Sequence, residues 1–196
     1  MSGVAPGTWR YALPVAAAGL VLLVVSVPAG ALGLAAAAVV VGFHRDPDRT
    51  VGEAAVVAPA DGRVSVLREE DDRLRVGVFM GLRNVHVNRA PIGGTVQSVS
   101  HSPGKHWPAF TKESDRNEKV HVEFADHAVT LVAGAVARRI HPYVAPGDAV
   151  ARGERVGHIS FSSRVDVLLP PDVTREDLLV ERGDRVRAGE TPVATR

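Results

Sequence analysis

The chain has 196 residues, a net charge of +1 and no cysteine, and this length suits one domain of ordinary size with an appendage. So small a net charge gives no field that would attract nucleic acid, and nucleic acid is therefore not expected as a partner. The absence of cysteine excludes disulfides, thiolate nucleophiles and cysteine-bound metals.

Residues 1–44 are interpreted as a hydrophobic membrane anchor. Residues 11–43 contain no charged or histidine side chain, which is the composition of a membrane segment. The run fits either a single helix across the bilayer or a helical hairpin that turns at residues 28–30, whose arms would each be shorter than a ~30 Å hydrocarbon core. A cleaved signal peptide is less favoured, because the apolar run continues past the small residues that would form its processing site.

Positive charge flanks the apolar run on both sides. Arg10 precedes it, and His44, Arg45 and Arg49 follow it. Because positive residues favour the cytoplasmic side, the charges predict that both ends of the anchor lie there, with the rest of the chain on the cytoplasmic side of the cell membrane.

Residues 45–196 predict a compact β-barrel or sandwich domain. Short runs rich in valine are bounded there by Gly, Pro, Asp or Asn, a pattern typical of strands and turns. No amphipathic helical pattern interrupts it between residues 46 and 167. The predicted strands are residues 64–67, 74–79, 95–99, 120–124, 129–133 and 165–169.

Two segments of this domain repeat each other. Residues 147–154 and 183–190 both read Gly-Asp-x-Val-x-x-Gly-Glu, and each predicts a turn, a short strand and a second turn. The units resemble the turns of lipoyl- and biotinyl-type β modules, so a membrane-anchored binding module of that type is one alternative function. A carrier of that type needs a lysine at a hairpin apex, and residues 120–196 contain none.

Residues 101–119 form a long polar segment without periodicity. It contains all three lysines of the chain together with Trp107 and Phe110. A loop of this length in a compact domain is often a functional lid, and a solvated surface excursion is the alternative.

Three residues, Ser163, His86 and Asp61, supply a hydroxyl, an imidazole and a carboxylate. A serine hydroxyl needs a base to become a nucleophile, His86 can take its proton, and Asp61 can orient the imidazole. The same parts would serve a membrane-anchored serine hydrolase, which is a second alternative. However, the Gly-x-Ser-x-Gly elbow of many hydrolases is missing around Ser163.

An ordered set of motifs in residues 43–170 resembles the phosphatidylserine decarboxylase family, in its short bacterial and archaeal branch. The branch includes archaetidylserine decarboxylases. The matching segments are Phe43-His44-Arg45-Asp46-Pro47, Pro59-Ala60-Asp61-Gly62, Val85-His86-Val87-Asn88-Arg89-Ala90-Pro91, Asn117-Glu118-Lys119, Ala137-Arg138-Arg139-Ile140 and Phe161-Ser162-Ser163-Arg164-Val165-Asp166.

The resemblance implies that the precursor cuts itself between Ser162 and Ser163. The hydroxyl of Ser163 would attack the carbonyl of Ser162, with Asp61 and His86 assisting. The products would be a large chain, residues 1–162, and a small chain, residues 163–196, which stay associated. Ser163 would become a pyruvoyl group, the covalent cofactor of the family, and no metal is expected. Ser162 stands where the family motif has glycine, so slower or absent cleavage remains an open alternative.

The resemblance also implies an activity at the membrane. The mature enzyme would decarboxylate a serine-headed phospholipid, phosphatidylserine or archaetidylserine, to the ethanolamine phospholipid, with His86 as the natural proton donor. The residues taken as candidates for substrate contacts are Arg89, Asn117, Glu118, Arg138 and Arg139. A homodimer is among the assemblies that stay open.

Overall fold

The computed structural model describes residues 3–105, 107–135, 139–160 and 163–196, and the chain divides into two compact units. We call residues Met1–Asp48 the helical unit and Arg49–Arg196 the β unit. The elements are α1 (Thr8–Val25), α2 (Val27–Phe43), β1 (Val56–Val57), β2 (Gly62–Glu70), β3 (Arg73–Met80), β4 (Val87–Arg89), β5 (Gly94–Thr95), β6 (Ser98–Ser102), η1 (Lys112–Arg116), β7 (Lys119–Glu123), β8 (Ala128–Ala133), β9 (Ile140–Pro142), β10 (Ala149–Val150), β11 (Arg155–Ile159), β12 (Ser163–Leu168), η2 (Arg175–Asp177), β13 (Arg185–Val186) and β14 (Pro192–Ala194).

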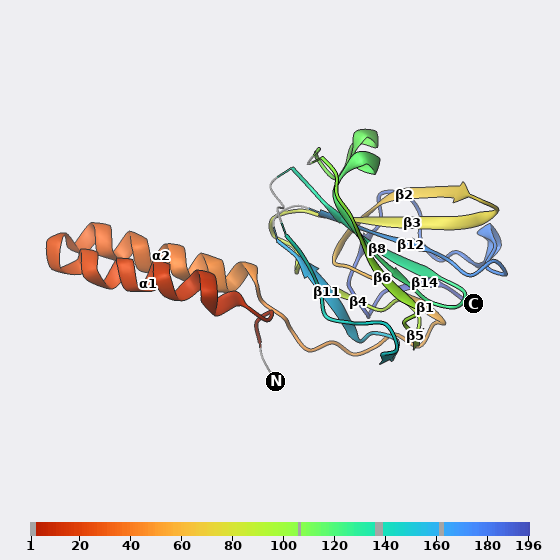
Figure 1. Ribbon diagram of the computed structural model, residues 1–196, viewed down its shortest axis with the longest axis horizontal. Helices are drawn as coiled ribbons and strands as arrows, with labels where there is room; N and C mark the ends of the chain where they lie inside the picture. Colours follow the sequence, from red (N-terminus) through yellow and green to blue (C-terminus); the bar gives the residue numbers. More distant parts are fainter. Residues whose placement is uncertain (1–2, 106, 136–138, 161–162) are drawn as a thin grey trace. The chain divides into compact units, whose positions relative to one another are not determined.

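The helical unit is a hairpin in which α1 and α2 lie side by side (Figure 1). Their backbones cross closely at Gly19 and Gly33, because a Cβ built on Gly33 would lie 2.7 Å from the Cα of Gly19. The turn falls at Ser26, so the predicted turn at residues 28–30 is wrong. Pro28 lies in the first turn of α2, where its missing N–H has no helical partner to lose. Helix α1 is long and apolar enough to cross a membrane.

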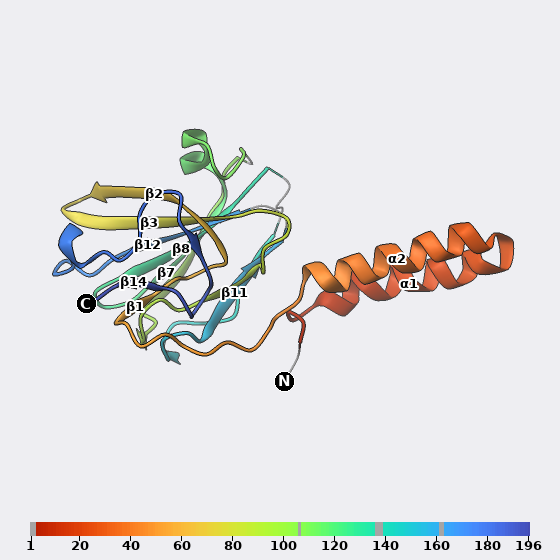
Figure 2. The ribbon, with the colours of Figure 1, turned by 180° about the vertical axis from the view of Figure 1, so that it is seen from behind.

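The β unit is built on a seven-stranded antiparallel sheet in the order β13-β2-β3-β12-β8-β7-β6. Strand β12 lies at its centre, paired with β3 on one side and β8 on the other. Figures 1 and 2 show this sheet from opposite sides. Three smaller sheets, β4-β11-β9, β1-β14 and β5-β10, complete the unit. The prediction of a mainly β domain is confirmed, but no sheet of the described residues closes into a barrel.

The two faces of the large sheet differ in polarity. Along β12, Val165 and Val167 belong to the apolar core, to which residues of the smaller sheets also contribute. Side chains alternate along a strand, so Ser163 shares this inner face while Arg164 and Asp166 lie on the outer one. The sheet therefore holds the predicted nucleophile on one face and its two charged neighbours on the other.

Five of the six predicted strands are confirmed within β2, β3, β7, β8 and β12, with bounds that differ by a few residues. The strand predicted at residues 95–99 is wrong as a single element. Val96 leaves the ladder of β5 and exchanges backbone hydrogen bonds with Gly147 and Asp148, and the chain then starts β6. Val99 remains packed against the core from β6.

The β unit contains the same small unit twice. The first unit is residues 58–64, Ala-Pro-Ala-Asp-Gly-Arg-Val, with residues 183–190; the second is residues 90–96, Ala-Pro-Ile-Gly-Gly-Thr-Val, with residues 147–154. In the first unit Arg185 pairs with Arg63 and Val186 with Gly62. In the second unit Ala149 pairs with Thr95 and Val150 with Gly94, in the same register.

Backbone hydrogen bonds confirm the correspondence between the two units. Gly183 and Asp184 exchange bonds with Val64 in the first unit, as Gly147 and Asp148 do with Val96 in the second. The units also bond to each other reciprocally, from Val57 N to Pro91 O at 3.0 Å and from Arg89 N to Pro59 O at 2.8 Å. The repeat found in residues 147–154 and 183–190 is thus half of a larger duplication.

Candidate active site

Ser163 is the first residue of the central strand β12, opposite Met80 of β3 and Ala133 of β8. Its side chain is fully buried, at 0 % exposure, and its Oγ has no hydrogen-bond partner among the described residues. A buried hydroxyl without a partner is unfavourable and needs an explanation in a native structure. A reactive role provides one. Ser162, on the other side of the predicted cleavage point, lies outside the described residues.

His86 lies just before β4 and is 2 % exposed. Its Nδ1 is 3.0 Å from the carbonyl oxygen of Asn84. A carbonyl can only accept, so Nδ1 carries the proton of the neutral ring and Nε2 is its basic nitrogen. The backbone carbonyl of His86 also accepts a bond from Ile159 N, at 3.3 Å, near the end of β11. His86 thus lies against the end of β11, four residues before Ser163 in the chain.

Asp61 lies in the turn between β1 and β2. Its carboxylate accepts hydrogen bonds from Arg49 at 2.9 and 3.1 Å and from the backbone N–H of Ala188 at 2.9 Å. The next residue must be glycine, because a Cβ on Gly62 would lie 2.0 Å from the carbonyl oxygen of Phe79. No hydrogen bond joins Asp61 to the imidazole, whose Nδ1 bonds Asn84 instead. The part of Asp61 in self-cleavage therefore stays a prediction.

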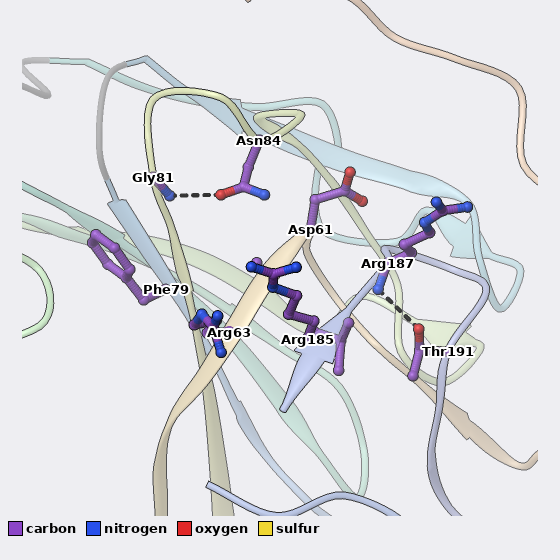
Figure 3. Close-up of a pocket in the computed structure, with 10 residues that line it drawn as sticks. Asp61, Arg63, Phe79, Gly81, Asn84, Arg185, Arg187 and Thr191 are labelled. Atoms are coloured by element: carbon purple, nitrogen blue, oxygen red, sulfur yellow. Dashed lines mark hydrogen bonds between the residues drawn. The ribbon is translucent and has the colours of Figure 1, made fainter. Parts of the chain in front are cut away.

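A cleft of about 710 Å³ opens beside these residues. Asp61 and Asn84 both line it, together with Phe79, Thr191 and three arginines (Figure 3). The remaining lining residues are Gly62, Arg63, Gly81, Arg185, Val186 and Arg187. Phe79 and Gly81 flank Met80, the register partner of Ser163, and Asn84 bonds His86. Of the three predicted catalytic residues, Asp61 lines the cleft, whereas Ser163 and His86 are not among its lining residues.

Two of the residues predicted to contact substrate, Arg89 and Asn117, are buried and bonded to the backbone. Arg89 is buried and donates to the carbonyl of Gly153 at 2.9 Å. Asn117 is buried and bonds the backbone of Trp107 and of Ala133, which fastens the loop to β8. These contacts give both residues a structural function in the fold.

Two of the remaining three predicted contacts lie among the described residues. Glu118 lies 2.8 Å from His101, and Arg139 is exposed. Arg138 lies outside the described residues. Substrate contacts of these residues stay predictions.

A buried ion network follows Ser163 directly; we call it the Arg164 network. Arg164 donates to Asp166 at 2.6 and 2.8 Å, to Asp115 at 2.9 Å and to the hydroxyl of Ser114 at 2.6 Å. Burial favours a higher pKa for Asp115, but the hydrogen bonds and charges of Arg164 and Arg68 outweigh it and lower the pKa of this carboxyl. The network fastens residues of the predicted loop to the strand that Ser163 begins.

The cleft arginines Arg63, Arg185 and Arg187 were not singled out from the sequence. The signal that reveals them is the duplication. Their counterparts in the second unit are Thr95, Ala149 and Ala151. Aligning both halves of the two units would have marked these positions as a departure from the repeat.

Taken together, a buried serine, a buried histidine and a polar cleft are the candidate parts of an enzyme site in this β domain. Residues 36–194 match the family model described as phosphatidylserine decarboxylase. A relative from Halobacterium salinarum, named "Putative archaetidylserine decarboxylase proenzyme", is 60% identical over 190 residues, which cover 96% of this chain and 97% of the relative.

Bacterial and archaeal relatives agree with this match. The phosphatidylserine decarboxylase proenzyme of Streptomyces avermitilis is 49% identical, over 86% of this chain and 78% of the relative. A second relative named "Putative archaetidylserine decarboxylase proenzyme", from Methanosarcina mazei, is 44% identical over 84% of this chain and 78% of the relative. The chain belongs to the phosphatidylserine decarboxylase family.

Proposed function

We propose that this protein is a self-processing, pyruvoyl-dependent decarboxylase of a serine-headed phospholipid, with ester- or ether-linked tails. The observation that carries the proposal is Ser163. It stands at the serine of the family's cleavage motif and is a buried hydroxyl without a described partner at the start of the central strand. Family membership and the names of the relatives, which include both phosphatidylserine and archaetidylserine proenzymes, support the reaction class.

The cleavage step needs a base beside Ser163. In the proposed step the Oγ of Ser163 attacks the carbonyl carbon of Ser162, and the peptide C–N bond breaks as an ester forms. Removal of the Cα proton of residue 163 then breaks the Cβ–O bond, which leaves Ser162 with a free carboxylate. Addition of water and loss of ammonia convert residue 163 into the pyruvoyl group. His86, with Nε2 as its basic nitrogen, is the candidate that moves these protons.

The residues around Ser163 fit such a group. The position is dry, since Ser163 is fully buried and Met80 and Ala133 flank it. When present, the pyruvoyl carbonyl supplies an electron sink for the electrons that the departing carboxylate leaves behind. The chain itself would exclude water from this end, and His86 would return a proton to the substrate carbon.

The architecture explains why the two product chains would stay together. The small chain, residues 163–196, would contribute β12, β13 and β14. Strand β12 pairs through six positions with β3 and six with β8, both from the large chain. Val165, Val167 and Leu169 from the small chain are also buried in the common core.

The helical unit supports a place at a membrane. Helix α1 is apolar and long enough to cross one, and large apolar side chains such as Leu20, Val24 and Leu32 are exposed on the hairpin. A lipid environment would cover these side chains. In the β unit, Leu82 and Phe110 are also exposed, near cleft residues Gly81 and Phe79. Placement of the β unit on the cytoplasmic side follows from the flanking positive charges and remains part of the proposal.

The intact mass of the purified protein under denaturing conditions tests the proposal. We expect two species, residues 1–162 and the 34 residues 163–196, the smaller with a blocked N-terminus that reacts with hydroxylamine. The Ser163→Ala variant should give one uncut chain of 20.7 kDa. Ser162→Gly, which restores the family motif, is the matched variant and should cut at least as fast.

Activity completes the test. The cut protein should convert a serine phospholipid to the ethanolamine phospholipid with release of one carbon dioxide per product, as measured by mass spectrometry of the lipids. An uncut wild-type chain, or a cut chain that hydrolyses the lipid without losing carbon dioxide, would overturn the proposal and favour a binding module or a hydrolase.

A further inference from the structure

We propose that Arg63, Arg185 and Arg187 form a binding site for the phosphodiester of a phospholipid headgroup. The inference rests on the proposed function, because it names the part of a serine phospholipid that the cleft holds. All three arginines line the cleft that contains Asp61 and Asn84. Figure 3 shows the guanidinium group of Arg185 between Arg63 and Asp61, with Arg187 on the far side of Asp61.

The duplicated fold shows that the arginines are not needed to build this backbone. The second unit has the same strand register and the same turn hydrogen bonds with threonine and alanine at the equivalent positions. Glu181 N bonds the carboxylate of Asp184 at 2.8 Å, and Ala145 N bonds that of Asp148 at the same distance. The two units differ at six positions, three of which are these arginines, so the shared strand register and turn bonds do not require an arginine at any of the three.

The placement of two of the arginines is electrostatically unfavourable. Arg63 and Arg185 are direct cross-strand partners on β2 and β13, and both are exposed. Like charges directly opposite each other destabilise a sheet, whereas the Thr95–Ala149 pair of the second unit has no such repulsion. An anion between the two guanidinium groups would turn this repulsion into attraction.

The local carboxylates neutralise the cleft arginines only in part. Both oxygens of Asp61 bond Arg49, and Glu190 lies 3.5 Å from Arg49 and 3.8 Å from Arg187. Arg185 forms no hydrogen bond or ion pair with another described residue. Arg63 donates one bond, to the carbonyl of Gly183 at 2.8 Å. Most donors of these groups therefore remain available, and a guanidinium presents them in the geometry that a phosphate binds.

A phosphodiester fits the site better than the substrate's other anion, its carboxylate. A carboxylate held by several arginines would be stabilised in the ground state and would resist loss of carbon dioxide. Arg63 pairs with Phe79, on the outer face of the sheet, whereas Ser163 pairs with Met80 on the inner face. The proposal therefore places the phosphate on the outer side of the sheet, near the end of β3 that carries Met80.

The first experiment measures binding without catalysis. In a Ser163→Ala background, the probe is sn-glycero-3-phosphoethanolamine, which has the phosphodiester but no carboxylate, and binding is measured by calorimetry. The test variant is Arg63→Thr/Arg185→Ala/Arg187→Ala, which introduces the residues of the second unit. We expect at least tenfold weaker binding, about 1.4 kcal/mol, since charge-assisted hydrogen bonds to the phosphate would be lost. Arg182→Gln, an exposed arginine of the adjacent turn that does not line the cleft, should bind as the parent does.

The second experiment identifies the source of the phosphodiester in the processed enzyme. In micelles of a neutral, phosphate-free detergent, a raised KM with a nearly unchanged kcat shows that the site holds the substrate's own phosphate. If the site instead holds a neighbouring lipid, the loss appears only in micelles that also contain phosphatidylglycerol.

The site is overturned if the parent does not bind the probe, or if the triple variant binds it as tightly as Arg182→Gln does. The binding experiment gives this answer even if the wild-type chain neither cuts itself nor decarboxylates a lipid, which is the result that would overturn the proposed function.

Discussion

Replacing Arg164 by methionine is expected to destabilise the β unit by about 3–5 kcal/mol, the usual effect of breaking a buried ion pair. The guanidinium of Arg164 holds both oxygens of Asp166, at 2.6 and 2.8 Å, and Asp166 is 2 % exposed. Without Arg164 the nearest cation is Arg75, 3.8 Å away. The buried carboxylate of Asp166 then has too little compensation for its lost hydration.

The assay is urea unfolding of the full chain in detergent. A Ser163→Ala background keeps the chain in one piece, so that cleavage does not enter the measurement. With Trp9 replaced by phenylalanine, Trp107 is the remaining tryptophan, and its fluorescence reports on the loop that Arg164 fastens. The change in free energy follows from the shift of the midpoint at an unchanged denaturant dependence.

Two further variants decide whether burial of the pair is the cause. Arg68→Met removes the exposed arginine that shares Asp115 with Arg164, and should destabilise by no more than about 1 kcal/mol. The double variant Arg164→Met/Asp166→Leu should be less destabilised than the sum of its single variants, because it removes both charges. Equal effects of Arg164→Met and Arg68→Met, or additivity in the double variant, would refute this reasoning.

Three other outcomes are expected. Gly62→Ala should destabilise the chain by about 1–3 kcal/mol or more and slow self-cleavage, since the new Cβ would overlap the carbonyl of Phe79. Urea unfolding measures the loss of stability, and intact mass measures the rate of cleavage. The pKa of Asp115 is held below its ordinary 3.8, so its contribution to the stability of the folded chain is complete above pH 3.8 and is lost as the pH falls through the folded-state pKa. Proteolysis of residues 103–118 should therefore increase at that acidic pH. The variant Asp115→Asn should abolish this pH-dependent increase. Leucine at Gly19 or Gly33 should separate the two helices. The separation would lower the yield of a disulfide crosslink between cysteines introduced into α1 and α2.

Local patterns in the sequence predicted the strands, because a run of valines between turn residues favours a buried β-strand over other secondary structures. The run at residues 120–124 is an example, since β7 lies there within one residue. The prediction of one strand at residues 95–99 was wrong because the backbone of Val96 bonds a turn some 50 residues away. A long-range bond of this kind cannot be recognised from a local sequence pattern. The turn at Ser26 was missed for a related reason. Proline marks a break in a pattern but also fits the first turn of the helix that follows.

The candidate site also has one part that the sequence indicated and another that it did not. The motifs indicated Ser163 and His86, and both are buried, while their catalytic roles stay predictions. The cleft could not be predicted, because residues 61–63 meet residues 185–191 only in the folded chain, through the pairing of β2 with β13 and the bond from Ala188 N to Asp61. Arg89 belongs to the motif that contains His86, and it is buried and bonds a backbone carbonyl. It therefore contributes to the fold, and its contact with substrate stays a prediction.

The position of the cleavage point reconciles self-cleavage with a stable fold. Among the described residues the ladder of β12 begins at Ser163, so all its described pairs with β3 and β8 lie on the small-chain side of the proposed cut. Breaking the peptide bond before Ser163 would therefore remove none of these pairs and would leave the new chain end at the edge of the core. A cut two residues later would free a buried part of the central strand. The fold thus allows this bond to be lost, while the Arg164 network on the next residue holds the new end in place.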